Sequence, residues 1–176
     1  MVALPFLLNQ TLGRDIAEVG MLIAPWPVMG ACLAPFSGKW SDRMSAGWLG
    51  VIGLALLAAG LLCVSWLPAG APMWAVMMPM ALCGTGFGLF LSPNQRFIMI
   101  TVPTHRASVA SGLSGLARLL GQTMGAACVA ACFTFSPDVG ATWALRAAVA
   151  FALAGSMASG MLELITRHAR HALAAS

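Results

Sequence analysis

A long uncharged stretch is the feature of this sequence that most restricts its fold. No Asp, Glu, Lys or Arg occurs between Met44 and Gln95. Over all 176 residues, hydrophobic residues make up 60% and charged residues 8%, whereas a typical soluble domain is about 45–50% apolar and about 25% charged. So few charges could not cover a soluble domain of this size. We therefore expect a polytopic helical membrane protein surrounded by lipid, and we exclude an ordinary soluble enzyme, a nucleic-acid-binding domain and a disordered tail.

Pro and Gly divide the apolar sequence into five segments, each long enough to cross a bilayer at about 20 residues per span. The predicted fold class is all-α, a single membrane domain over residues 1–176 with helices at about 18–36, 48–66, 73–95, 107–133 and 141–165 and a tail at 167–176. The third helix could also continue past Pro93 as a kinked helix towards Val102. Met1–Leu8 is apolar but too short to span. We interpret it as the end of a sixth helix, so we expect upstream helices to be missing.

Basic residues predict the orientation of these helices. One set of helix ends carries Lys39, Arg43, Arg96, Arg106, Arg167 and Arg170, and the opposite set carries Arg14 and Arg146. Positive residues are enriched in cytoplasmic loops. We therefore expect a multi-pass protein of the plasma (inner) membrane, with its N-terminus outside and its C-terminus in the cytoplasm.

Several motifs resemble one family of transporters. The loop Gly38–Arg43, with the sequence GKWSDR, resembles the second-half copy of the signature loop of the major facilitator superfamily. Three later stretches resemble its drug:proton antiporter-2 branch, the fourteen-span multidrug efflux pumps: Gly84–Asn94, Val102-Pro103 followed by Ala110–Gly112, and Ala117–Ala127. The resemblance covers nearly the whole chain and matches the C-terminal half of the family. It implies a C-terminal fragment that lacks the opposing N-terminal helices.

The resemblance also implies a function for the complete protein. It is proton-coupled export of drugs or other hydrophobic or cationic compounds by alternating access, in which two helical bundles rock about a midplane site. The implied partners are the lipid bilayer, a small-molecule substrate, protons and the missing N-terminal helices, and we expect the chain to be inactive alone. Two alternatives stay open. One is a facilitator of another substrate class, such as a sugar or an organic anion, and the other is a non-transporting membrane scaffold or regulatory protein.

Enzyme chemistry has no sequence signal here. The chain shows no P-loop, catalytic triad or zinc-ligand spacing, so we expect no enzymatic activity, no cofactor and no nucleic-acid partner. The five cysteines lie in apolar stretches. Cys128 and Cys132 share a helix face, but no His or carboxylate accompanies them, so we expect no metal site.

The loop after the first predicted helix is a candidate gate. Gly38, Asp42 and Arg43 carry the family pattern. Charges at such a turn can form salt bridges and contacts with helix ends that hold one conformation of a rocking transporter. The alternative is that Lys39 and Arg43 only anchor the topology.

Arg118 is the most informative single residue. It lies 12 positions after Arg106, which places it roughly 18 Å along a helix at about 1.5 Å per residue, near the bilayer centre. An arginine there costs at least about 2.5–3.5 kcal/mol without partners or water. Its helix offers a polar face made of Ser111, Ser114, Arg118 and Gln122. That face could line the transport pathway, or Arg118 could pair with a carboxylate of the absent half. A shifted helix could instead let Arg118 reach the interface.

Polar residues on the third predicted helix are further candidates. The resemblance places this helix beside the central cavity, so Thr85 and Ser92 are candidate cavity residues and Asn94 a candidate for the cytoplasmic mouth. The alternative is that the hydroxyls bond to their own helix and that Asn94 marks its end. Gly84 and Gly88 are spaced for a close approach of two helices.

Overall fold

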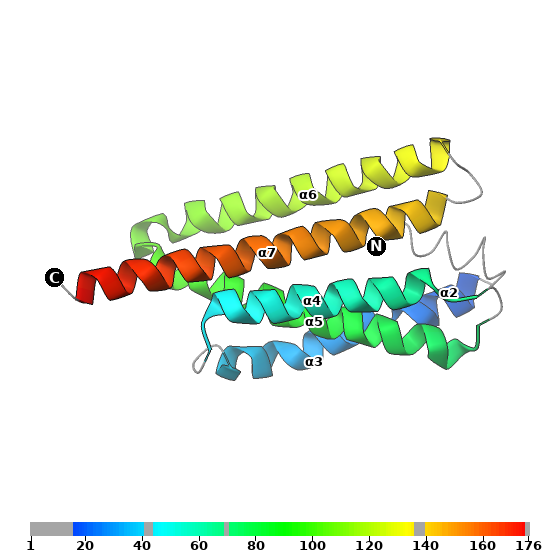
Figure 1. The fold of residues 1–176 in the computed structure, drawn as a ribbon, viewed down its shortest axis with the longest axis horizontal. Helices are drawn as coiled ribbons and strands as arrows, with labels where there is room; N and C mark the ends of the chain where they lie inside the picture. The colour runs from blue at the N-terminus through cyan, green and yellow to red at the C-terminus, as the bar shows by residue number, and fades with distance from the viewer. Residues whose placement is uncertain (1–15, 41–43, 69–70, 136–139, 175–176) are drawn as a thin grey trace.

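Helices account for nearly all of the residues that the structure describes, which are 16–40, 44–68, 71–135 and 140–174. In this computed structural model the helices are α2 (Ile16–Ile23), α3 (Pro25–Trp40), α4 (Ala46–Ser65), α5 (Met73–Thr101), α6 (Ala107–Phe135) and α7 (Gly140–Ala174), with a short 3-10 turn at Thr104–Arg106 (Figure 1). Five helical segments are long and apolar enough to cross a membrane, the first of them formed by α2 and α3 together. The predicted all-α class with five spans is confirmed.

The ends of the helices differ from those expected from the sequence. The first span is interrupted at Ala24, and Pro25 occupies the first position of α3, where its missing N–H costs no helical hydrogen bond. Helix α5 continues past Pro93 and ends at Thr101, because Pro103 disfavours helical backbone at the residue before it. Helix α7 continues beyond the predicted span to Ala174, since leaving the apolar sequence does not by itself end a helix.

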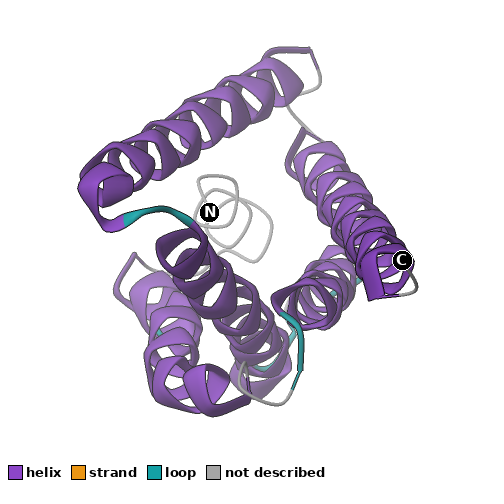
Figure 2. Ribbon diagram, turned by 90° about the vertical axis from the view of Figure 1, so that its left-hand side faces the viewer, coloured by secondary structure: helices purple, strands orange, loops and turns teal. Residues whose placement is uncertain are grey.

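Helix α5 is the centre of the bundle. It packs along α3 on one side and α4 on the other, and α4 packs in turn along α7. Helix α6 contacts α7, and it also contacts α5 near the turn that joins α5 to α6. Figures 1 and 2 show α6 standing away from the tightly grouped α3, α4 and α5. Helices α3 and α5 end, and α4 and α6 begin, at one end of the bundle, which we call the Lys39 end. We call the opposite end the Trp66 end.

Glycines allow the backbones of α3, α4 and α5 to approach closely. A Cβ placed on Gly53 would lie 2.6 Å from the carbonyl oxygen of Gly86 and 2.8 Å from the amide nitrogen of Phe90. A Cβ on Gly84 would lie 2.9 Å from the Cα of Trp26 in α3. Only hydrogen fits at these positions, so the three helices share backbone contacts of the kind that drives helix association in lipid.

The largest buried cluster lies towards the Trp66 end. Its members come from α2, α3, α4, α5 and α7 and are Val19, Leu22, Trp26, Leu61, Val64, Val76, Met80, Cys83 and Leu145. The rings of Trp26 and Phe87 approach with centroids 6.1 Å apart and an interplanar angle of 50°, which is within the range of favourable tilted aromatic pairs. This cluster ties α2 and α3 to the rest of the bundle.

Helix α6 is the exception to this packing. From Thr104 to Thr134, where every residue is described, none is buried. The glycines of this helix also face open space, since a Cβ on Gly112, Gly121 or Gly125 would meet no atom within 4 Å. Gly121 and Gly125 have the same four-residue spacing as Gly84 and Gly88, but among the described residues no helix approaches them closely.

We predict that Gly86→Ala weakens the bundle. The new methyl group would collide with backbone atoms of α4, including the amide nitrogen of Leu57 at 2.6 Å, and overpacking of this kind costs about 1–3 kcal/mol. The matched control is Gly112→Ala, which adds the same methyl group to α6 in open space. Thermal unfolding of the purified chain in detergent, followed by the loss of monodisperse protein, should show a lower midpoint for Gly86→Ala only. Equal midpoints for the two variants would contradict the role of this contact.

Candidate functional site

The polar face predicted on the fourth span lies along α6. Ser111, Arg118 and Gln122 are exposed, and Ser114 is half-buried. Helix α6 begins at Ala107, so Arg118 lies about 17 Å from its start at about 1.5 Å per residue. The helix is 29 residues long, more than a bilayer requires. Arg118 therefore lies well inside the span, on a helix that the described chain leaves uncovered.

The candidate residues on α5 lie in two different environments. Thr85 is half-buried, and its Oγ1 donates a hydrogen bond to the carbonyl oxygen of Ala81 at 2.9 Å. This hydroxyl thus bonds to its own helix, which was the simpler of its two interpretations. Ser92 is half-buried as well, whereas Asn94 is exposed at the Lys39 end. Asn94 lines the second of the two pockets described below, and Thr85 and Ser92 line neither of these two.

The candidate gate loop is only partly described. Gly38 lies in the last turn of α3, which ends at Trp40, and Lys39 beside it is exposed. Asp42 and Arg43 lie outside the described residues.

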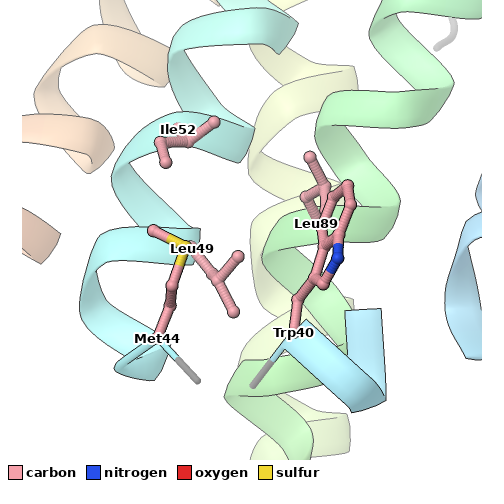
Figure 3. A pocket seen from close by; sticks show the side chains of 5 residues that line it. All are labelled: Trp40, Met44, Leu49, Ile52 and Leu89. Atoms are coloured by element: carbon pink, nitrogen blue, oxygen red, sulfur yellow. The ribbon is translucent and has the colours of Figure 1, made fainter. Parts of the chain in front are cut away.

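Two pockets flank the start of α4. The first has a volume of about 360 Å³ and is lined by the apolar side chains of Trp40, Met44, Leu49, Ile52 and Leu89 (Figure 3). These residues come from the end of α3, the start of α4 and the middle of α5. The indole nitrogen of Trp40 is the only side-chain polar atom among these five residues. This pocket therefore suits an apolar group rather than a charged one.

The second pocket lies between α4, α5 and α7 and combines an apolar lining with several polar side chains. It has a volume of about 450 Å³, and its lining includes Ser45, Asn94, Arg96, Ser159, Glu163 and Thr166. Glu163 is only 9% exposed, which is unusual for a carboxylate in an apolar bundle. The Oγ of Ser45 is buried and has no hydrogen-bond partner in the structure. This pocket gathers both a carboxylate and a guanidinium at the Lys39 end.

Sequence reasoning missed Glu163 as a site residue. The signal was present, since Glu163 is the one charged residue between Ala147 and Thr166. A lone carboxylate in an apolar helix indicates a specific partner. Glu163 lies against Gly47 of α4, a helix distant in the sequence, so the pattern of α7 alone could not identify this contact. Among the described residues, no three His, Cys, Asp or Glu side chains come together.

Comparison with known proteins identifies the family. The model of the Major Facilitator Superfamily matches residues 1–126. The chain belongs to this superfamily. It is 44% identical over 161 residues to an uncharacterized transporter, YebQ, of Escherichia coli, an alignment that covers 92% of the chain and 35% of the relative. It is 30% identical to the multidrug resistance protein Stp of Mycobacterium tuberculosis, covering 67% of the chain and 22% of the relative.

A third relative broadens the range of substrates among these similar proteins. The riboflavin transporter RibZ of Clostridioides difficile is 25% identical, over 70% of the chain and 27% of the relative. The chain thus spans about a third or less of the length of the curated relatives it matches. In a major facilitator protein, a segment of this size supplies part of one helical bundle, so its exposed surfaces have to be considered together with the helices of the other bundle.

We predict that the two sides of α6 differ in hydration within a complete transporter. The test uses a chimera in which this chain replaces the matching segment of the E. coli relative, with native cysteines removed. Gln122→Cys lies on the polar face, and Leu120→Cys lies about 200° away around the helix. A water-soluble maleimide should label position 122 several-fold faster than position 120. Equal labelling at both positions would contradict a polar face that meets water.

Proposed function

We propose that this chain forms the C-terminal part of a proton-coupled exporter of hydrophobic or cationic compounds that works by alternating access. The observation that carries the proposal is the match to the Major Facilitator Superfamily, together with similarity to a multidrug resistance protein. The exposed polar face of α6 supports it, because Arg118 needs water, substrate or an opposite charge if this helix crosses the membrane. The protein would lie in the inner membrane, with the Lys39 end and the C-terminus in the cytoplasm.

The packing supports a division of roles among the helices in this proposal. Helices α3, α4 and α5 share backbone contacts at glycines, and α7 packs along α4, so these four helices would move as one body. Helix α6 has no buried residue between Thr104 and Thr134, so its surface is available for contact with other helices of the transporter. In our proposal, the N-terminal helices of the transporter cover the α6 face in one conformation and part from it in another. The gate loop Gly38–Arg43 would stabilise one of these two conformations.

Arg118 would couple the proton to this movement. In a low dielectric, a guanidinium is stable only beside a carboxylate or water. A carboxylate of the N-terminal helices would pair with Arg118 when ionised and release it when protonated. The two protonation states would then favour different arrangements of the two bundles, which is what proton-coupled alternating access requires. Gln122 and the serines of the same face would bind water or polar groups of the substrate along this path.

A second candidate function rests on a different relative. The similarity to the riboflavin transporter RibZ favours a transporter of another substrate class over a scaffold. The positive charge of Arg118 also suits an anionic group of a substrate. Under this alternative Arg118 would bind the substrate directly, and the direction of transport could be inward.

We predict that the chimera with the E. coli relative lowers the accumulation of cationic dyes in an efflux-deficient strain, and that a protonophore abolishes this effect. Arg118→Ala should abolish export while leaving the chimera in the membrane, because the coupling charge is removed. Arg118→Lys should retain part of the export, since it keeps the charge but not the planar fork. Immunoblots of membrane fractions provide the control for protein amount.

Two results would count against this proposal. Unchanged export by Arg118→Ala would remove Arg118 from the mechanism. Riboflavin or anion uptake by the chimera, with no export from a panel of dyes, would favour the second candidate function instead.

A further inference from the structure

The buried carboxylate at the Lys39 end plays no part in the mechanism above. Glu163 lies in α7, is 9% exposed, and contacts the start of α4. A Cβ placed on Gly47, in the first turn of α4, would lie 2.5 Å from the Glu163 Oε2 and 2.8 Å from its Cβ. Only glycine leaves room there for the carboxylate. The sequence of α4 thus accommodates this one side chain of another helix.

The start of α4 is also where such a carboxylate is useful. The first amide groups of a helix have no partner within the helix, and the helix dipole makes this end positive. Ser45 occupies the N-cap position but makes no side-chain capping hydrogen bond. Its Oγ is buried with no hydrogen-bond partner. The usual local solution is therefore not used, although serine is among the preferred N-cap residues.

We propose that Glu163 replaces this local cap: its carboxylate stabilises the first turn of α4 and thereby fixes the cytoplasmic start of α4 to α7. Glu163 is then a positioning residue of the transporter. It holds two helices of one bundle together at the end where the bundle must move against its partner. The role in transport rests on the proposed function, whereas the contact itself does not.

The contacts between α4 and α7 continue this arrangement towards the membrane interior. A Cβ on Gly50 would lie 3.6 Å from the Cβ of Ser159, in ordinary contact, and the Oγ of Ser156 donates a hydrogen bond to the carbonyl oxygen of Val51 at 3.1 Å. Helices α4 and α7 therefore run antiparallel and in close contact along this stretch. They show that Glu163 is the charged end of a continuous interface rather than a side chain that reaches across open space.

Arg96 of α5 is the other charged group described around this pocket. It is exposed, so water would screen an attraction between Arg96 and Glu163 more than it screens a buried contact. We therefore assign the positioning role to the contact with α4 and a lesser role to Arg96. The two roles predict different effects of Glu163 and Arg96 substitutions on hydrogen exchange at the first amides of α4.

Hydrogen–deuterium exchange of the chain in lipid nanodiscs tests the contact directly. Glu163→Ala should accelerate exchange of the amides at residues 46–48 about tenfold or more, the range expected for loss of a hydrogen bond to a charged group. Peptides from the start of α5 at the Trp66 end should be unchanged. Glu163→Gln keeps the shape and an acceptor oxygen, so it should fold and show a smaller acceleration.

Matched variants separate this role from general packing. Ser156→Ala removes a hydrogen bond between the same two helices and should leave exchange at residues 46–48 unchanged. Arg96→Ala should accelerate it less than Glu163→Ala does. Unchanged exchange in both Glu163 variants, or an equal acceleration in Arg96→Ala, would overturn the proposal.

Transport by the chimera tests the functional consequence. Glu163→Ala should lower the maximal rate of export several-fold and leave the half-saturating substrate concentration unchanged, because Glu163 belongs to α7 and contacts the start of α4, and it is not part of the polar face of α6. Glu163→Gln should restore part of the rate. A raised half-saturating concentration with an unchanged maximal rate would overturn the positioning role. A chimera that exports nothing would instead contradict the proposed function and leave the exchange result standing.

Discussion

The close approach of α5 to α3 and α4 is the contact on which the rest of the structure depends. In lipid, apolar side chains gain little by leaving the solvent, so helices associate mainly through van der Waals contact and hydrogen bonds at short range. Gly84 and Gly86 provide that contact on two sides of α5, against Trp26 and Gly53. Because both contacts involve backbone atoms, neither α3 nor α4 can shift sideways without losing one of them. This arrangement produces a rigid group of helices in a chain with few polar links.

The same principle explains why α6 differs. Its glycines face no neighbour, and no residue from Thr104 to Thr134 is buried. It is joined to the bundle through α7 and its junction with α5. Rigid packing and an exposed polar face thus belong to different helices. A transporter that rocks needs this separation, because the helix that contacts the opposing bundle cannot also be fixed by backbone contacts on every side.

The sequence predicted the fold class better than the site. Few charges and regular Pro and Gly breaks were enough for five spans, because lipid forces every backbone group into helical hydrogen bonds. Helix ends were less predictable. The continuation of α5 past Pro93 to Thr101 was expected only as an alternative, because a proline can be tolerated inside a bundle. The basic segment after Ile165 did not end α7, since charge does not stop a helix. The face of α6 follows from spacing alone. The pairing of Glu163 with Gly47 does not, because it joins residues 116 positions apart in the sequence, and periodicity within one helix carries no information about its neighbour.

The two conspicuous charges of the described chain differ in a way that separates their functions. Glu163 is buried among helices of its own bundle, while Arg118 is exposed on a helix that has no buried residue. In our proposal, the buried Glu163 carboxylate contacts α4 of the same bundle, so its role there is to stabilise that bundle. An exposed charge at mid-membrane depth is energetically costly unless water, a substrate or an opposite charge from outside the bundle contacts it. In the proposed mechanism, the free energy of Arg118 would depend on the position of the opposing helices, and this dependence would allow a proton or a substrate to change the conformation of the transporter.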